Sequence, residues 1–156
     1  MPFWASAVGF VIAPIATLIA VWMTSHFAWR RSQNERIWDR KANAYGAILE
    51  ALHEMEDWFT ENMNDEMMSR DPPEEIIEKR GESYRSAERA LRAVVGREAW
   101  LLAPTVKVRA EAMNKMLAAR CDGWFEHLDA GSFAVAQAIK DITVLATKEL
   151  GTASNR

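Results

Sequence analysis

The sequence predicts an all-α protein, in which an N-terminal transmembrane helix continues into a cytoplasmic antiparallel four-helix bundle. Residues 3–23, FWASAVGFVIAPIATLIAVWM, contain no charged side chain. Apolar residues then recur at steps of three and four along the rest of the chain, which is the period of an amphipathic helix. No segment alternates with a period of two, so no strand is expected.

The uncharged run is long enough to cross a bilayer, since a hydrocarbon core of about 30 Å needs about 20 apolar residues in a helix. A cleaved signal peptide would carry Lys or Arg before a shorter apolar run, and none precedes this one. We therefore expect an uncleaved single-pass anchor over residues 1–29. Five basic residues follow it and form a membrane-surface basic patch: Arg30, Arg31, Arg36, Arg40 and Lys41. Because positive charge stays in the cytoplasm, the N-terminus is expected outside and the remaining chain inside.

The anchor contains a stripe of small residues, which suggests helix pairing, and a proline. Small residues recur every four positions, a stripe that lets two helices approach closely in lipid: Ala5, Gly9, Ala13 and Thr17. Pro14 removes one backbone donor in the middle of the run, and a kink is expected there. A homo-oligomer formed through this stripe is one expected outcome. The other is a stripe that only reflects the small residues common in membrane helices.

The helix that leaves the anchor should carry one apolar face and end near MMSRDPP, because Pro72 and Pro73 cannot continue it. No Pro separates this face from the anchor, so we expect one continuous helix. The face consists of Trp38, Ala42, Tyr45, Leu49, Leu52, Met55, Phe59 and Met63.

Three further helices complete the predicted bundle over residues 30–151, with 152–156 as a flexible tail. The second should start after Pro73 with Asp71 as N-cap, reach about Ala103, and bury Ile77, Arg80, Tyr84, Ala87, Leu91 and Val94. The third should start at Pro104 and bury Val106, Met113, Leu117, Cys121 and Trp124. LDAGS at 128–132 should break the pattern before a last helix that buries Phe133, Ala136, Ile139, Ile142 and Leu145 and ends at Gly151.

The net charge of −3 conceals three unlike regions. Residues 30–41 hold five basic and two acidic side chains, residues 50–78 hold one basic and eleven acidic, and residues 79–156 hold thirteen basic and nine acidic. No stretch is basic enough over a whole domain to predict nucleic-acid binding.

Candidate chemistry is sparse. Glu50 and His53 form one Glu-x-x-His pair, but a di-metal bundle site needs a second pair and two further glutamates, so a solvated helix edge is favoured. Cys121 with His127 could serve as nucleophile and base, yet Cys121 falls on an apolar face, where a small buried residue is the rule. We expect no catalytic residue, no metal and no cofactor, and no small-molecule substrate is evident.

Four arginines recur along the predicted second helix and could bind an acidic partner: Arg80, Arg85, Arg89 and Arg92. Pairing with the acidic first helix of the same bundle is the favoured interpretation.

The segments WDRKANAYGAILEAL, AERALRAVVGREAWLLAPTVKVRAEAMNKML and ATKELG resemble a loose group of bacterial single-pass membrane-anchored helical-bundle proteins of unknown function. The resemblance implies a bundle tethered to the bacterial inner membrane and carries no activity to transfer. We therefore expect a non-enzymatic interaction or scaffold protein that contacts the lipid bilayer and a membrane or cytoplasmic protein partner. The alternative is a membrane-active phage or defence-type effector that acts through an oligomerised anchor.

Overall fold

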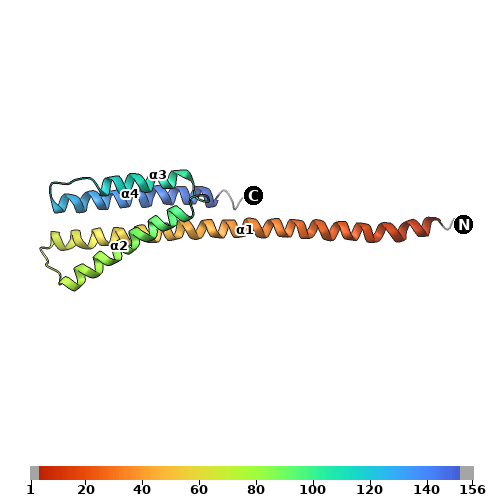
Figure 1. Ribbon diagram of the computed structural model, residues 1–156, viewed down its shortest axis with the longest axis horizontal. Helices are drawn as coiled ribbons and strands as arrows, with labels where there is room; N and C mark the ends of the chain where they lie inside the picture. The colour runs from red at the N-terminus through yellow and green to blue at the C-terminus, as the bar shows by residue number, and fades with distance from the viewer. Residues whose placement is uncertain (1–3, 152–156) are drawn as a thin grey trace. The chain divides into compact units, whose positions relative to one another are not determined.

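The computed structural model confirms an all-α fold (Figure 1), and residues 4–151 contain four helices and no strand. The helices are α1 (Trp4–Met67), α2 (Glu74–Arg97), α3 (Pro104–Leu117) and α4 (Trp124–Gly151). The structure describes the backbone of residues 4–151 and the side chains of residues 22, 29 and 33–151. The chain divides into two compact units, Met1–Asp39 and Arg40–Arg156, and the second unit is a helical bundle.

Among the described residues, no helix is long and apolar enough to cross a membrane. The predicted span at 3–23 lies, apart from Trp22, outside the residues whose side chains are described. The structure therefore gives the N-terminal transmembrane helix no support, and the helix stays a prediction.

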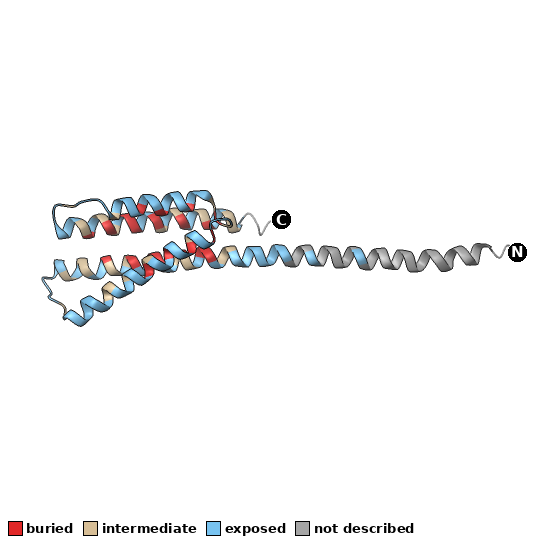
Figure 2. Ribbon diagram, in the orientation of Figure 1, coloured by how far each residue is buried: buried red, intermediate tan, exposed pale blue. Residues whose placement is uncertain are grey.

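The core of the bundle unit lies along α1, as the apolar stripe predicts (Figure 2). Tyr45, Leu52, Met55 and Phe59 are all less than 2% exposed, and α1 ends at Met67, close to its predicted end. The buried face is wider than the stripe because it also includes Ala44, Ile48 and Ala51. The expected burial of Trp38 is wrong: its side chain is 41% exposed. Trp38 precedes the bundle unit, where the helical period continues but the core does not.

Helix α2 is shorter and more exposed than predicted. Its N-cap is Pro73 rather than Asp71, and it ends at Arg97, where the amides of Leu101 and Leu102 turn back to the carbonyl of Glu98. Its second half is buried as expected at Ala87, Leu91 and Val94. Ile77, near its start, is 49% exposed, so the predicted buried face is wrong at this end.

The break between α3 and α4 lies at residues 118–123, not at the predicted LDAGS segment of 128–132. LDAGS is helical and faces the core, with Leu128 and Gly131 buried. Gly131 acts here as a packing residue: a Cβ at this position would overlap the ring of Phe59. A glycine that the sequence marks as a breaker is therefore a point of close contact between α1 and α4.

Helix α4 buries mostly small residues, and this explains why the predicted face was partly wrong. Phe133 is 63% exposed and Ala136 is exposed, whereas Ile142 is buried as predicted. The buried positions of α4 are Leu128, Gly131, Ala134, Val135, Ala138, Ile142 and Ala146. In α3, Val106 and Met113 are buried as predicted, but Trp124 is 51% exposed and Cys121 lies in the 118–123 connection.

Two polar links fasten the start of the bundle unit. The Arg40 guanidinium donates two hydrogen bonds to Glu98, at 2.9 and 3.1 Å, and lies 5.2 Å from the Trp100 ring centroid. Lys41 Nζ lies 2.6 Å from Glu149 Oε2, and the same oxygen accepts a 2.9 Å hydrogen bond from the Tyr45 hydroxyl. The bidentate, charge-assisted pair of Arg40 with Glu98 fixes geometry more firmly than an isolated surface pair. The two links connect α1 to the α2–α3 connection and to the end of α4.

Acid is expected to weaken the fold through Glu98. The hydrogen bonds from Arg40 hold the pKa of this buried carboxyl below its ordinary 4.5. Because the folded-state pKa is the lower one, the stabilisation is complete above pH 4.5 and is lost as the pH falls through the folded value. Thermal melts across this acid range should show the melting temperature of Glu98→Gln falling less steeply than that of the parent. Glu111→Gln, at an exposed site on α3, should keep the parent's slope; parallel curves for all three proteins would contradict the assignment.

High pH is expected to weaken the fold through Tyr45. Burial, with the hydrogen bond to Glu149 second, raises the pKa of Tyr45 from 10.0 to about 12. Because the pKa is higher in the folded chain, the neutral, hydrogen-bonded Tyr45 stabilises the fold below pH 10. This stabilisation is lost as the pH rises through about 12. In a spectrophotometric titration of the native chain, Tyr45 should ionise to tyrosinate well above pH 10. In the chain unfolded in guanidinium, it should ionise near pH 10. Tyr45→Phe should remove the highest step, and a native midpoint at the unfolded value would refute the link.

Candidate functional site

An aromatic cluster occupies the end of the bundle unit where α1 ends and α2 begins. The Trp58 ring centroid lies 4.9 Å from those of both Phe59 and Tyr84, and 6.2 Å from that of Trp124. The His127 ring stacks on Trp124 with centroids 5.8 Å apart. Edge-to-face and tilted pairs at these distances are favourable for aromatic rings. Side chains from α1, α2 and α4 are thus held in one rigid group.

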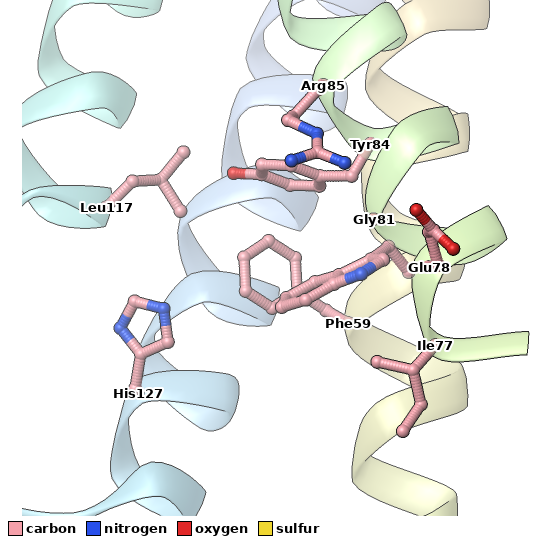
Figure 3. Close-up of a pocket in the computed structure, with 9 residues that line it drawn as sticks. Phe59, Ile77, Glu78, Gly81, Tyr84, Arg85, Leu117 and His127 are labelled. Atoms are coloured by element: carbon pink, nitrogen blue, oxygen red, sulfur yellow. The ribbon is translucent and has the colours of Figure 1, made fainter. Parts of the chain in front are cut away.

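This cluster forms the wall of a cavity of about 440 Å³ that is partly open to solvent (Figure 3). All four helices contribute to its lining: Trp58, Phe59, Ile77, Glu78, Gly81, Tyr84, Arg85, Leu117 and His127. Figure 3 shows Leu117 and His127 facing Phe59 and Tyr84 across the hollow. Burial raises the pKa of the Tyr84 hydroxyl, and the charge of Glu88 adds to the effect. The cavity therefore presents mainly apolar and aromatic surface with a few polar groups.

A second hollow of about 460 Å³ lies between α1 and α2 on the other side of Trp58. Its polar lining includes Glu54, Asp57 and Glu61 from α1, with Lys79 and Arg80 from α2. Arg80 forms ion pairs with α1, since its guanidinium lies 2.6 Å from Glu61 and 2.5 Å from Asp65. This pairing confirms the favoured interpretation for Arg80, and Arg92 pairs instead with Glu88 on its own helix.

Acidic side chains outnumber basic ones along the second hollow, whereas the aromatic cavity is lined by one of each, Glu78 and Arg85. Of the eleven acidic side chains between residues 50 and 78, three are paired within the described chain, by His53 and Arg80. The other eight form no ion pair with any residue whose side chain is described: Glu50, Glu54, Asp57, Glu66, Asp71, Glu74, Glu75 and Glu78. This end of the bundle therefore carries a strongly negative field.

The predicted basic patch is divided by the structure. Arg40 and Lys41 form ion pairs with Glu98 and Glu149 of the bundle unit, whereas Arg36 is exposed. The side chains of Arg30 and Arg31 lie outside the described residues. A role of this patch at a lipid surface stays a prediction, and it would depend mainly on the three arginines that precede Arg40.

The predicted helix-pairing stripe of Ala5, Gly9, Ala13 and Thr17, together with Pro14, lies outside the residues whose side chains are described. The alternative function as a membrane-active effector depends on these positions, so it stays a prediction. Expression that leaves growth and membrane potential unchanged would contradict it.

The structure does not bring together either of the weaker site candidates. His53 is exposed and its Nδ1 lies 3.2 Å from Glu56, not from Glu50. Within the described part of the chain, no group of three or more metal-ligating side chains converges. The His127 ring lies against Phe59 and Trp124, and the Cys121 thiol donates a 3.9 Å hydrogen bond to the carbonyl of Ala119.

Sequence reasoning identified several lining residues as core positions but did not identify the cavity. Phe59, Tyr84 and Leu117 belong to predicted apolar faces, and Ile77 was expected inside. Trp58 was missed because it lies beside the α1 stripe rather than in it. The sequence signal for Trp58 is its place next to Phe59: two adjacent large aromatics point in different directions from a helix, so they indicate a buried face wider than the single stripe.

No protein-family model, curated protein or solved structure matches the chain. Over residues 4–151, fold and site define an all-α protein of four helices, whose bundle unit has an aromatic cavity near a segment rich in acidic residues.

Proposed function

We propose that this protein is a non-enzymatic, membrane-tethered interaction module whose bundle unit binds a protein partner at the aromatic cavity. One observation carries the proposal: a partly open, largely apolar cavity is lined by all four helices and has exposed Ile77 at its edge. Trp124, which packs against Trp58, is itself 51% exposed. Apolar concavities and contiguous exposed apolar groups mark binding surfaces more often than inert ones.

The tether is supported by the charge pattern of the sequence. An uncharged run of about 20 residues followed by arginines is typical of a span with its basic flank in the cytoplasm. We therefore propose the inner membrane as the location, with the bundle unit on the cytoplasmic side. A reporter fused after Arg156 should be active only in its cytoplasmic form, and the chain should resist carbonate extraction from membranes. Periplasmic reporter activity would reverse the orientation, and release by carbonate would refute the tether.

The binding role is tested in cells with a photo-crosslinking amino acid in place of Ile77, at the cavity edge. Val144, on α4, is the matched control because it is also exposed, at 61%, and lies outside the cavity lining. We expect a discrete covalent adduct from position 77 and not from position 144. Adducts from neither position, together with a monomeric particle in detergent, would contradict the proposed function.

A further inference from the structure

We propose that the occupant of the cavity is a basic amphipathic helix of a partner protein. One bulky apolar side chain of that helix enters the cavity, and its Lys or Arg side chains face the acidic surface around it. This inference rests on the proposed function and adds the chemistry of the partner.

The distribution of polar groups around the cavity favours a side-chain anchor. Pockets for small molecules usually hold a few polar groups that converge on the ligand. Here the charged lining groups, Glu78 and Arg85, are both exposed. The other polar lining side chains, Tyr84 and His127, lie with the rings of Trp58 and Phe59 in a mainly aromatic wall. An aromatic wall with an apolar interior matches the pockets that bind anchor residues at protein interfaces.

Charge complementarity determines the sign of the partner. Glu78 lies on the cavity, and Glu54 and Asp57 line the neighbouring hollow, separated from the cavity by Trp58. None of the three forms an ion pair with a described side chain. Carboxylates that gather at one end of the bundle unit repel one another, and a cationic partner relieves that repulsion as it binds. The basic lining residues Arg85 and Lys79 are outnumbered by the acidic residues of the 50–78 segment, so an acidic helix would be repelled more than it is attracted.

A second copy of this chain offers a weaker match than a different protein. Residues 29–41 contain exposed Trp29, Ile37 and Trp38 beside basic side chains, so the segment has roughly the required pattern. However, Arg40 and Lys41 are occupied by Glu98 and Glu149 of their own bundle unit. The remainder, residues 29–39, holds three basic and two acidic side chains, a net charge of only +1. A partner with a denser basic face fits the acidic surface better.

The test measures binding of labelled peptides to the purified full-length chain in a neutral detergent, by fluorescence anisotropy. The probe is a synthetic Leu/Lys peptide with leucines at helical spacing of three and four. One control peptide replaces every Lys with Glu, and another has the same composition in an order that destroys the apolar face. We expect saturable binding of the probe alone, in the micromolar range, weakening as salt is raised because the charges are screened.

Variants locate the binding site. Ile77→Ser removes apolar surface at the cavity edge, and Glu78→Lys reverses a charge there; each should weaken binding of the probe by about fivefold or more. Both sites are exposed, so both variants should melt like the parent. The matched controls are Val144→Ser and Glu111→Lys, since Val144 lies outside the cavity lining and Glu111 lines a separate α2–α3 groove. Neither should change the affinity.

Equal binding of the Lys and Glu peptides, or affinity unchanged by both Ile77→Ser and Glu78→Lys, would overturn the inference. Tighter binding of a peptide copied from residues 29–41 than of the Leu/Lys probe would also overturn it, in favour of self-association. The proposed function has a separate outcome: a partner crosslinked at position 77 while the basic probe fails to bind would leave the interaction module intact and remove only its basic partner.

Discussion

Replacing Gly131 with alanine is expected to lower the free energy of unfolding by about 1–2 kcal/mol, although alanine is the better helix former. A Cβ at this position would overlap the ring of Phe59, which is only 1% exposed and is held by Trp58 and Tyr84. Overpacking of a filled core costs about 1–3 kcal/mol, and the deep overlap favours the upper end. The gain in helix propensity of about 1 kcal/mol offsets only part of this cost. Chemical denaturation of the full-length chain measures the difference.

Gly46 is the matched control for this effect. It is also a helical glycine, but no atom lies within 4 Å of a Cβ built there. Gly46→Ala should therefore raise the free energy of unfolding by roughly 0.5–1 kcal/mol, the opposite sign. A second control is Phe59→Leu, which should suppress part of the cost of Gly131→Ala because the two residues share one contact. Equal effects of alanine at both glycines would show that Gly131 is not a packing position.

Leu52→Ala is expected to destabilise the bundle unit by about 2–5 kcal/mol, the range for a fully buried leucine. Leu52 has no exposed surface and lies on α1 in the same core cluster as Ile48, Met55 and Ile142. A loss of this size is a large share of the 5–15 kcal/mol that typically holds a domain folded. Thermal and urea unfolding of the full-length chain should show it clearly.

The Glu50→Ala substitution on the same helix tests whether the loss of stability in Leu52→Ala comes from the buried position of Leu52 or from any change in this part of α1. Glu50 is exposed and forms no ion pair with a described residue, so its replacement should change stability by less than about 0.5 kcal/mol. If Leu52→Ala melted like Glu50→Ala, the α1 stripe would not be part of the folded core.

Periodicity determined much of the architecture without the structure. Steps of three and four along α1 identified Tyr45, Leu52, Met55 and Phe59, because a large apolar side chain on one helical face has no favourable place except a core. The prolines at 72, 73 and 104 located the starts of α2 and α3, because proline lacks the backbone donor that a helix interior requires but not the first turn. The excess of acidic residues between 50 and 78 was likewise evident from the sequence alone.

The exact faces and the cavity depended on tertiary contacts. Gly131 is read locally as a breaker, and only the ring of Phe59 across the interface makes it a packing residue inside α4. Phe133 is large and apolar yet exposed, since α4 turns its small residues toward the core. The partners of Arg40 and Lys41 lie 58 and 108 positions away, at Glu98 and Glu149, beyond the reach of any local pattern. The sequence alone thus determined the helical class, the core face of α1 and the distribution of charge. Tertiary structure decided the α3–α4 boundary and which groups meet, because close packing depends on residues that are distant in the chain.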